Sequence, residues 1–413
     1  MDSLWGRRRR GDGDVAGERS PGRRRRKLGR QRFCILVTTA LTGAALIAVL
    51  LSMLIMVNGE KELFRTLQVH VIFRHGERTP TDTYPNDPYK ADDYWPEGWG
   101  QLTNKGKMQL YELGVYLRSR YGGTGLRALL DGAYQSSETK ILSSYADRCI
   151  ASAGVLLAGM FPPSASPGGS QVWLDALDWQ PVPIRYRAKE DDNIIVSKKP
   201  CPRYDADLKA VYASPEVQIV NKENKDLYDH LTENAGKTYS SVLDVEFLYN
   251  TLQIEEIRGL ELPDWVKGWY PERMRPLASL SLALFTRTLP MKRTKSGVLL
   301  GQIGDHMNKK ISTKDDSKVY LYSGHDTTIV NMLQALGVGE DSFKPEFGAA
   351  ILVELLEAAN GDKHVQVLLK NSTSSEELFP IELPDCLKPC KIENFLKLPA
   401  ITTPEQWENE CKI

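Results

Sequence analysis

The sequence lacks the patterns that usually indicate a catalytic metal or a serine nucleophile. Its 413 residues include only six histidines, none in an H-E-x-x-H motif or beside carboxylates at zinc-ligand spacing. The G-x-S-x-G turn of α/β-hydrolases is also absent. We therefore expect no metal and no cofactor, and we expect the chemistry to depend on other side chains.

The chain also lacks an excess of charge of either sign. Lysine plus arginine and aspartate plus glutamate both total 53, so the formal net charge is zero. A nucleic-acid-binding protein usually carries a clear basic excess, and we therefore expect no nucleic acid partner. Internal repeats are absent as well. The length predicts two structural parts, or one large domain with a substantial insertion.

The start of the chain predicts a membrane anchor. Residues 1–32 hold two basic clusters and few apolar side chains, which predicts a disordered tail. Residues 33–57 contain no charged residue and exceed the roughly 20 apolar residues that span a bilayer. The positive-inside tendency places residues 1–32 in the cytoplasm and everything after a linker at 58–66 in a lumen or outside the cell. A cleaved signal peptide is the alternative, although its apolar run is usually only about 7–15 residues long.

This topology predicts a single-pass type II membrane protein of the lysosome, another endomembrane or the cell surface. Five of the six cysteines follow the expected span, in a compartment where disulfides persist. A sequon at Asn371 predicts a glycan in the same compartment. Five cysteines cannot all pair within one chain, and their spacing alone leaves the connectivity open.

Two strands that each end in a histidine-containing turn define the expected core. Residues 67–74 run directly into His75, and residues 318–323 run into the turn that holds His325. Further apolar patterns predict helices at 103–121, 147–159, 240–252, 273–289 and 326–336, and strands at 349–356 and 364–369.

These elements predict an α/β fold. We expect an α/β catalytic core over residues 67–179 and 290–411, and a mainly helical insertion over residues 180–289, which we call the cap.

The two histidine turns contain side chains suited to phosphate chemistry. Ligands gather at the carboxyl ends of strands in an open α/β sheet, so adjacent strands would bring both turns into one pocket. Arg74 and Arg78 offer guanidinium groups that match phosphate oxygens. The imidazole of His75 can attack phosphorus, and Asp326 can protonate the leaving alkoxide. Because a carboxyl with a low reference pKa must be protonated for this, we expect activity to be highest in acid.

The motifs Arg74-His75-Gly76-x-Arg78-x-Pro80 and His325-Asp326 resemble the two signatures of the histidine acid phosphatases of the prostatic and lysosomal type. The similarity covers residues 65–411 and includes Gln101-Leu102-Thr103, Phe161-Pro162-Pro163, Trp179-Gln180-Pro181 and Cys201-Pro202-Arg203.

This resemblance implies a three-layer histidine-phosphatase core with a cap. It implies that His75 is the nucleophile that forms a phosphohistidine and that Asp326 is the proton donor. It assigns phosphate binding to Arg74, Arg78 and His325. It further implies small phosphomonoesters or phosphoproteins as substrates, and a homodimer.

One departure from the family pattern concerns a third phosphate-binding arginine, whose expected position is occupied here by Leu142. Losing such a contact can cost about a hundredfold in rate. The alternative function is therefore a catalytically impaired surface protein that binds a phosphorylated ligand. Arg148 lies nearby in the sequence, but we expect the helix there to point it elsewhere.

A second departure concerns the cysteines. The family has three disulfides, and the resemblance implies two of them here, Cys386–Cys390 and Cys149–Cys411. It leaves Cys201 without a partner.

Overall fold

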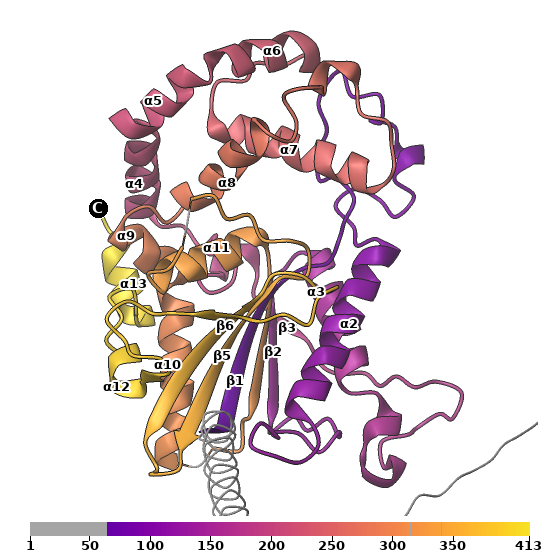
Figure 1. The fold of residues 1–413 in the computed structure, drawn as a ribbon, viewed down its shortest axis with the longest axis vertical. Coiled ribbons are helices and arrows are strands. Elements are labelled where there is room, and N and C mark those ends of the chain that lie inside the picture. The colour runs from indigo at the N-terminus through magenta and orange to yellow at the C-terminus, as the bar shows by residue number, and fades with distance from the viewer. Residues whose placement is uncertain (1–63, 314, 340) are drawn as a thin grey trace, which may run out of the picture. The chain divides into compact units, whose positions relative to one another are not determined.

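The computed structural model describes residues 64–313, 315–339 and 341–413, and a mixed eight-stranded sheet is their central element (Figure 1). The strand order is β3-β2-β4-β1-β5-β6-β7, with β8 paired to β6. The strands are β1 (Phe64–Arg74), β2 (Thr139–Ser143), β3 (Arg185–Tyr186), β4 (Val319–Gly324), β5 (Ala350–Ala358), β6 (Lys363–Lys370), β7 (Phe379–Ile381) and β8 (Cys390–Lys391). Strands β1 to β4 are mutually parallel, and β5 runs antiparallel to β1.

Helices cover both faces of this sheet. Neighbouring side chains of β1 point to opposite sides, and because they are apolar on both sides, each face packs against helices. Val71 and Phe73 pack in one hydrophobic cluster with residues of two helices, and Ile72 packs in the other. The first pair of helices is α2 (Asn104–Tyr121) and α3 (Asp147–Met160). The opposite cluster includes residues of α10 (Val298–Thr313) and α11 (Asp326–Ala335). This arrangement confirms the predicted three-layer α/β fold.

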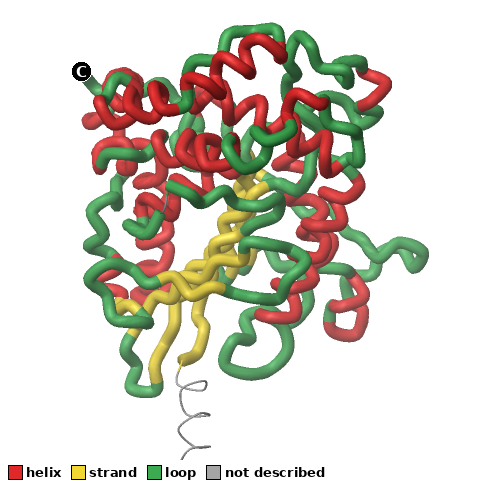
Figure 2. The backbone as a smooth tube through the Cα atoms, turned by 45° about the horizontal axis from the view of Figure 1, so that its top comes forward, coloured by secondary structure: helices red, strands yellow, loops and turns green. Residues whose placement is uncertain are grey.

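Most of the remaining helices lie in the segment that follows β3. They form an arch beyond the end of the sheet at which β1 and β4 terminate (Figure 1). Figure 2 shows the helices gathered at that end of the strands. They are α4 (Pro202–Tyr212), α5 (Pro215–Glu223), α6 (Lys225–Ala235), α7 (Val242–Ile257), α8 (Met274–Leu284) and α9 (Leu289–Lys292). A π-helical segment, Arg293–Gly297, joins α9 to α10. Near the C-terminus lie α12 (Ile392–Phe395) and α13 (Pro404–Glu410).

The sheet extends farther along the sequence than expected. Strand β3 pairs with β2, with Arg185 opposite Leu142. Residues 185 and 186 therefore belong to the sheet although they fall within the segment predicted as cap. At the other end, β1 begins at Phe64, so the last residues of the expected linker are part of a strand.

One expected disulfide is confirmed and the other is wrong. Cys386 pairs with Cys390, as expected. Cys411 pairs with Cys201 instead of Cys149, which forms no disulfide within the described residues. The cause is tertiary: the chain end returns beside the start of α4, where the N–H of Arg203 donates to the carbonyl of Cys411 at 3.3 Å.

The predicted anchor lies outside the part of the chain that the structure describes. This holds for the tail at 1–32 and the span at 33–57. Among the described residues, no helix combines the length and the apolar character needed to cross a membrane.

Candidate active site

The pairing of β1 with β4 brings the two histidine turns together. The strands are parallel with Arg74 opposite Gly324, so the next residues, His75 and His325, leave the same edge of the sheet. The N–H of His75 donates to the carbonyl of Gly324 at 2.9 Å. The centroids of the two imidazole rings are 5.4 Å apart. Two motifs about 250 residues apart in sequence therefore share one site, as their position after strands predicts.

The hydrogen bond of His75 selects one tautomer of its ring. Its Nδ1 lies 2.8 Å from the carbonyl oxygen of Gly76, and a carbonyl can only accept, so Nδ1 carries the proton. Nε2 then has a free lone pair. The residue is only 2% exposed, and burial together with the charges of Arg148 and Arg74 holds its pKa well below the usual value. The imidazole therefore stays neutral in acid.

Gly76 is required beside this ring because the chain packs closely here. A Cβ built on Gly76 would lie 2.2 Å from the carbonyl oxygen of Gly106 in α2, so any larger residue would push the histidine turn away from the helix.

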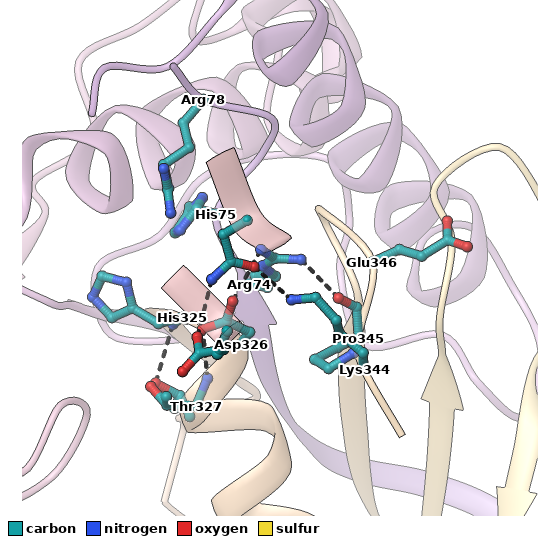
Figure 3. Close-up of polar contacts among 12 residues, drawn as sticks. Arg74, His75, Arg78, His325, Asp326, Thr327, Lys344, Pro345 and Glu346 are labelled. Carbon is teal, nitrogen blue, oxygen red and sulfur yellow. Dashed lines mark hydrogen bonds and ion pairs between the residues drawn. The ribbon is translucent and has the colours of Figure 1, made fainter. Parts of the chain in front are cut away.

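Two arginines of the first motif are held at the site by main-chain oxygens. Nη1 of Arg74 donates to the carbonyl of Pro345 at 2.7 Å, and Nη1 of Arg78 donates to the carbonyl of Thr79 at 2.9 Å. Burial, followed by the charge of Arg148, lowers the pKa of Arg78 to about 9. Figure 3 shows Arg78 above His75, with Arg74 and Asp326 on the other side of the ring.

A third arginine reaches the site from α3. Nη2 of Arg148 donates to Nδ1 of His325 at 3.3 Å, so Nε2 of His325 carries the proton and donates to Oγ of Ser144 at 2.9 Å. Burial and then Arg148 lower the pKa of His325 to about 3. The expectation that the helix points Arg148 away is wrong, because α3 begins at Asp147, just beyond the carboxyl end of β2, and its first turn faces the pocket.

The structure gives Leu142 a role in the core. It lies within β2 opposite Tyr322 and packs against the larger hydrophobic cluster. The aliphatic residue at 142 therefore does not leave the site short of a cation, since the third guanidinium comes from position 148.

Asp326 is the first residue of α11 and faces these cations. Its Oδ2 lies 3.0 Å from Nη2 of Arg74, and its Oδ1 accepts from the N–H of Thr327 at 2.8 Å. Burial favours the protonated form, but the charges of Arg74 and Lys344 outweigh it and hold the pKa well below the usual range. The carboxylate is therefore ionised before substrate binds.

Two residues beside the site were not found from the sequence. Lys344, on the loop before β5, donates from Nζ to Oδ1 of Asn250 at 2.8 Å. Glu246 of α7 accepts from Nδ2 of Asn250 at 3.0 Å and from Oγ of Ser281 at 3.1 Å. Burial, reinforced by the charge of Asp326, raises the pKa of Glu246 to about 7. Neither residue stands in a recognisable motif, so only tertiary structure reveals them.

Comparison with known proteins agrees with this arrangement. Residues 67–370 match the family described as the histidine phosphatase superfamily (branch 2). Human lysosomal acid phosphatase is 32% identical over 374 residues, which cover 90% of this chain and 86% of that protein. Human prostatic acid phosphatase is 32% identical over 348 residues, covering 83% and 87%.

Solved structures show the same fold. The apo form of the Hafnia alvei phytase aligns with a TM-score of 0.63 at 16% identity and covers 85% of this chain and 98% of its own. From the family match, the identity to these relatives and the shared fold, we conclude that the chain belongs to the histidine phosphatase superfamily, branch 2.

Proposed function

We propose that the chain is an acid phosphatase that hydrolyses phosphate monoesters through a phosphohistidine on His75. The observation that carries the proposal is the state of that ring, whose Nδ1 is bound to the carbonyl of Gly76 while its Nε2 is free to attack. The relatives named lysosomal and prostatic acid phosphatase support the same activity.

Phosphate binding follows from the charge of the site. The charges of Arg148, Arg74 and Arg78 all act on the His75 ring, and within the described residues Asp326 forms an ion pair with only one of them, Arg74. A phosphate at His75 supplies further negative charge. The N-terminus of α11 adds a positive dipole end at the same place. His325 is a neutral ring whose Nε2–H donates to Ser144. A rotation of the ring would aim this N–H at a phosphate oxygen instead.

The first chemical step transfers the phosphoryl group. Nε2 of His75 attacks phosphorus, the bond from phosphorus to the ester oxygen breaks, and Asp326 gives its proton to the departing alkoxide. Asp326 must therefore gain a proton before this step. A bound phosphate engages Arg74 and offsets the surrounding cations, which raises the pKa of Asp326. This requirement for a protonated carboxyl explains a preference for acid.

The second step releases phosphate. Water attacks the phosphohistidine, the bond from phosphorus to Nε2 breaks, and the carboxylate of Asp326 takes a proton from the water. This leaves neutral His75 and protonated Asp326 in the phosphate complex, and Asp326 gives up its proton again when phosphate leaves Arg74.

The test is phosphate release from glycerol 2-phosphate, whose alkoxide leaving group needs a proton, by the full chain in detergent, scanned across pH. We expect acid-favoured turnover that falls by roughly a thousandfold or more in His75→Ala. His364→Ala is the matched control, because His364 lies on β6 opposite Leu356 and has no part in the mechanism. A folded protein that binds phosphate without turnover would instead support the alternative, a non-catalytic phosphate-binding surface protein.

We further propose that residues 33–57 anchor the chain and that the catalytic part lies in a lumen or outside the cell. Its two disulfides suit an oxidising compartment. Asn371 is partly exposed at the end of β6, where it can carry a glycan. Treatment with a glycosidase should reduce the mass of the wild type but not that of Asn371→Gln, which would support this topology. A wild type that carries no glycosidase-sensitive mass would argue against it.

A homodimer is the partner proposal that the surface supports. The loop between α3 and β3 projects from the body of the domain (Figure 1). It exposes a group of apolar side chains: Val172, Trp173, Leu174, Leu177 and Trp179. Trp173 is 58% exposed, and grouped apolar side chains mark association surfaces. Sedimentation of the detergent-solubilised chain should show a dimer that Trp173→Arg converts to a monomer, and an unchanged dimer in that variant would exclude this surface.

The division into a catalytic core and a helical cap is part of the same proposal. Its support is that α7 contributes Glu246 and Asn250 to the edge of the site, so that the insertion forms part of the substrate pocket.

A further inference from the structure

We propose that Lys344 forms a second anion-binding position beside the phosphate site, which selects phosphate monoesters whose leaving group carries a carboxylate close to the ester oxygen. This inference rests on the proposed phosphatase function and adds to it a class of substrate.

The segment that holds Lys344 is built into the phosphate site. The carbonyl of the next residue, Pro345, accepts from Nη1 of Arg74 at 2.7 Å. The guanidinium carbon of Arg74 lies 4.0 Å from the ring centroid of Phe347, and that ring lies 5.9 Å from the His75 ring. Figure 3 shows Lys344, Pro345 and Glu346 beside Arg74. Any movement of this segment would disturb the phosphate ligands, so Lys344 has a fixed position relative to them.

Lys344 is a buried cation that forms no direct ion pair with any described residue. It is only 6% exposed, and within the described part of the chain its Nζ has one hydrogen-bond partner, the neutral side chain of Asn250. An ammonium group has three N–H donors, and burying its charge without a counter-ion is costly. A buried lysine held by one neutral acceptor is therefore poised to receive an anion from outside the protein.

The nearby acid does not neutralise this lysine under acidic conditions. Glu246 bonds to the other side of Asn250, and burial together with Asp326 raises the pKa of Glu246 to about 7. Burial lowers the pKa of Lys344 only to about 8, with Asp326 opposing the shift. Below pH about 8 the ammonium of Lys344 is charged. Below pH about 7 the carboxyl of Glu246 is protonated and carries no charge.

The position of Lys344 relative to the proton donor identifies which part of the substrate it meets. The two terminal nitrogens of the Arg74 guanidinium bind the carbonyl of Pro345, the residue after Lys344, at 2.7 Å and Oδ2 of Asp326 at 3.0 Å. The charge of Lys344 also lowers the pKa of Asp326. Asp326 is the proposed donor to the leaving oxygen, so Lys344 lies on the leaving-group side of the phosphate. Among the described residues, Lys344 is the one cation that bonds to Asn250. A single ammonium group suits the single negative charge of a carboxylate on the leaving group.

The experiment compares two substrates that differ at one group. 2-Phosphoglycerate carries a carboxylate where glycerol 2-phosphate carries a hydroxymethyl group. We measure kcat/KM for both with the full chain in detergent, at acid pH, and take their ratio within each variant. That ratio cancels differences in folded fraction, so a general loss of activity does not affect it.

We expect the ratio of kcat/KM for 2-phosphoglycerate to that for glycerol 2-phosphate to exceed one in the wild type. In Lys344→Met this ratio should fall about tenfold. Lys344→Arg should retain most of it. The matched control is Lys295→Met, because Lys295 is a partly buried lysine whose Nζ donates to the carbonyl of Ser197 and not to Asn250. In this control the ratio should not change.

A second variant keeps the test valid if Lys344→Met fails to fold. Asn250→Asp keeps the side-chain shape but supplies a carboxylate that pairs with Lys344, and it should lower the preference in the same way. An unchanged ratio in the folded variants overturns the proposal for Lys344 while leaving the phosphatase intact. Absence of turnover by the wild type with either substrate, and with p-nitrophenyl phosphate, instead overturns the proposed function itself.

Discussion

Arg74 and Asp326 form an ion pair of 3.0 Å at the centre of the site. The same guanidinium is a proposed phosphate ligand, and the same carboxylate is the proposed proton donor. Before substrate binds, the donor is therefore ionised and cannot act. Binding of phosphate competes for Arg74 and allows Asp326 to take up a proton, which links substrate binding to readiness for catalysis.

This link predicts that the effect of Asp326→Asn depends on the leaving group. An alkoxide needs a proton to depart, so turnover of glycerol 2-phosphate should fall by roughly 10²–10⁴-fold. p-Nitrophenolate departs readily without a proton, so kcat/KM for p-nitrophenyl phosphate, which reports the first step alone, should fall far less. Steady-state kinetics with both substrates check this, and Asp341→Asn is the control, because Asp341 pairs with Arg287 on the surface. Equal losses for both substrates would remove Asp326 from the proton-donor role.

Arg148→Met should lower kcat/KM by about a hundredfold, because it removes one of the three guanidinium groups that we propose bind the transferring phosphate. It should also raise the pKa of His325, which the charge of Arg148 now depresses. Kinetics and NMR titration of the histidine signals measure the two effects. The double variant Leu142→Arg with Arg148→Met should not recover activity, because residue 142 packs against the core. Recovery would mean that position 142 supplies the third cation after all.

Glu255 should make the protein less stable in alkaline solution. It is fully buried on α7, and burial together with Asp87 raises its pKa from 4.5 to about 9. Because the pKa of Glu255 is higher in the folded state than in the unfolded chain, its protonated form contributes fully to stability below pH about 4.5. This contribution falls as pH rises from 4.5 and is lost once pH passes through 9. The loss should be on the order of 5 kcal/mol in the free energy of unfolding.

Urea unfolding at pH 5 and pH 9 measures this loss in the wild type and in Glu255→Gln, which cannot ionise. The variant should lose clearly less stability between the two values. Equal losses in both proteins would show that Glu255 does not cause the pH dependence.

The disulfide between Cys201 and Cys411 joins the start of α4 to the chain end, with 210 residues between its cysteines. Replacing both cysteines with serine should lower the free energy of unfolding by roughly 3 kcal/mol, because the unfolded chain gains freedom. Urea unfolding checks the magnitude. Peptide mapping without reduction should find Cys201 linked to Cys411, and Cys149 should react with an alkylating agent only after unfolding. A linked pair of Cys149 and Cys411 would contradict the structure.

The sequence predicted the central part of the fold because its signals there are local. Strand patterns that run directly into His75 and His325 indicate both the strands and the turns, and strand pairing then brings the turns together. The cap of α2 was equally readable, since Oγ1 of Thr103 accepts from the N–H of Gly106 at 3.0 Å, as an N-cap residue does. Strand β2 was missed because five residues give too short a pattern.

The errors concern relationships that only tertiary structure determines. The direction of Arg148 depends on how α3 follows the carboxyl end of β2, and β2 was not predicted. The pairing of Cys201 depends on the return of α13 to α4. Lys344 and Glu246 are isolated charged residues on a loop and a helix, and they gain meaning only through Asn250 between them.

The central claim is that His75 carries the phosphoryl group during turnover. The most direct test mixes the full chain with excess p-nitrophenyl phosphate, whose leaving group needs no proton. The mixture is denatured within milliseconds in alkali, where phosphohistidine survives, and the modified peptide is mapped by mass spectrometry. We predict a phosphate on His75 that is absent from His75→Ala and that accumulates in Asp326→Asn, in which release is slowed. Rapid turnover with no phosphate on His75, or with phosphate on another residue, would contradict the mechanism.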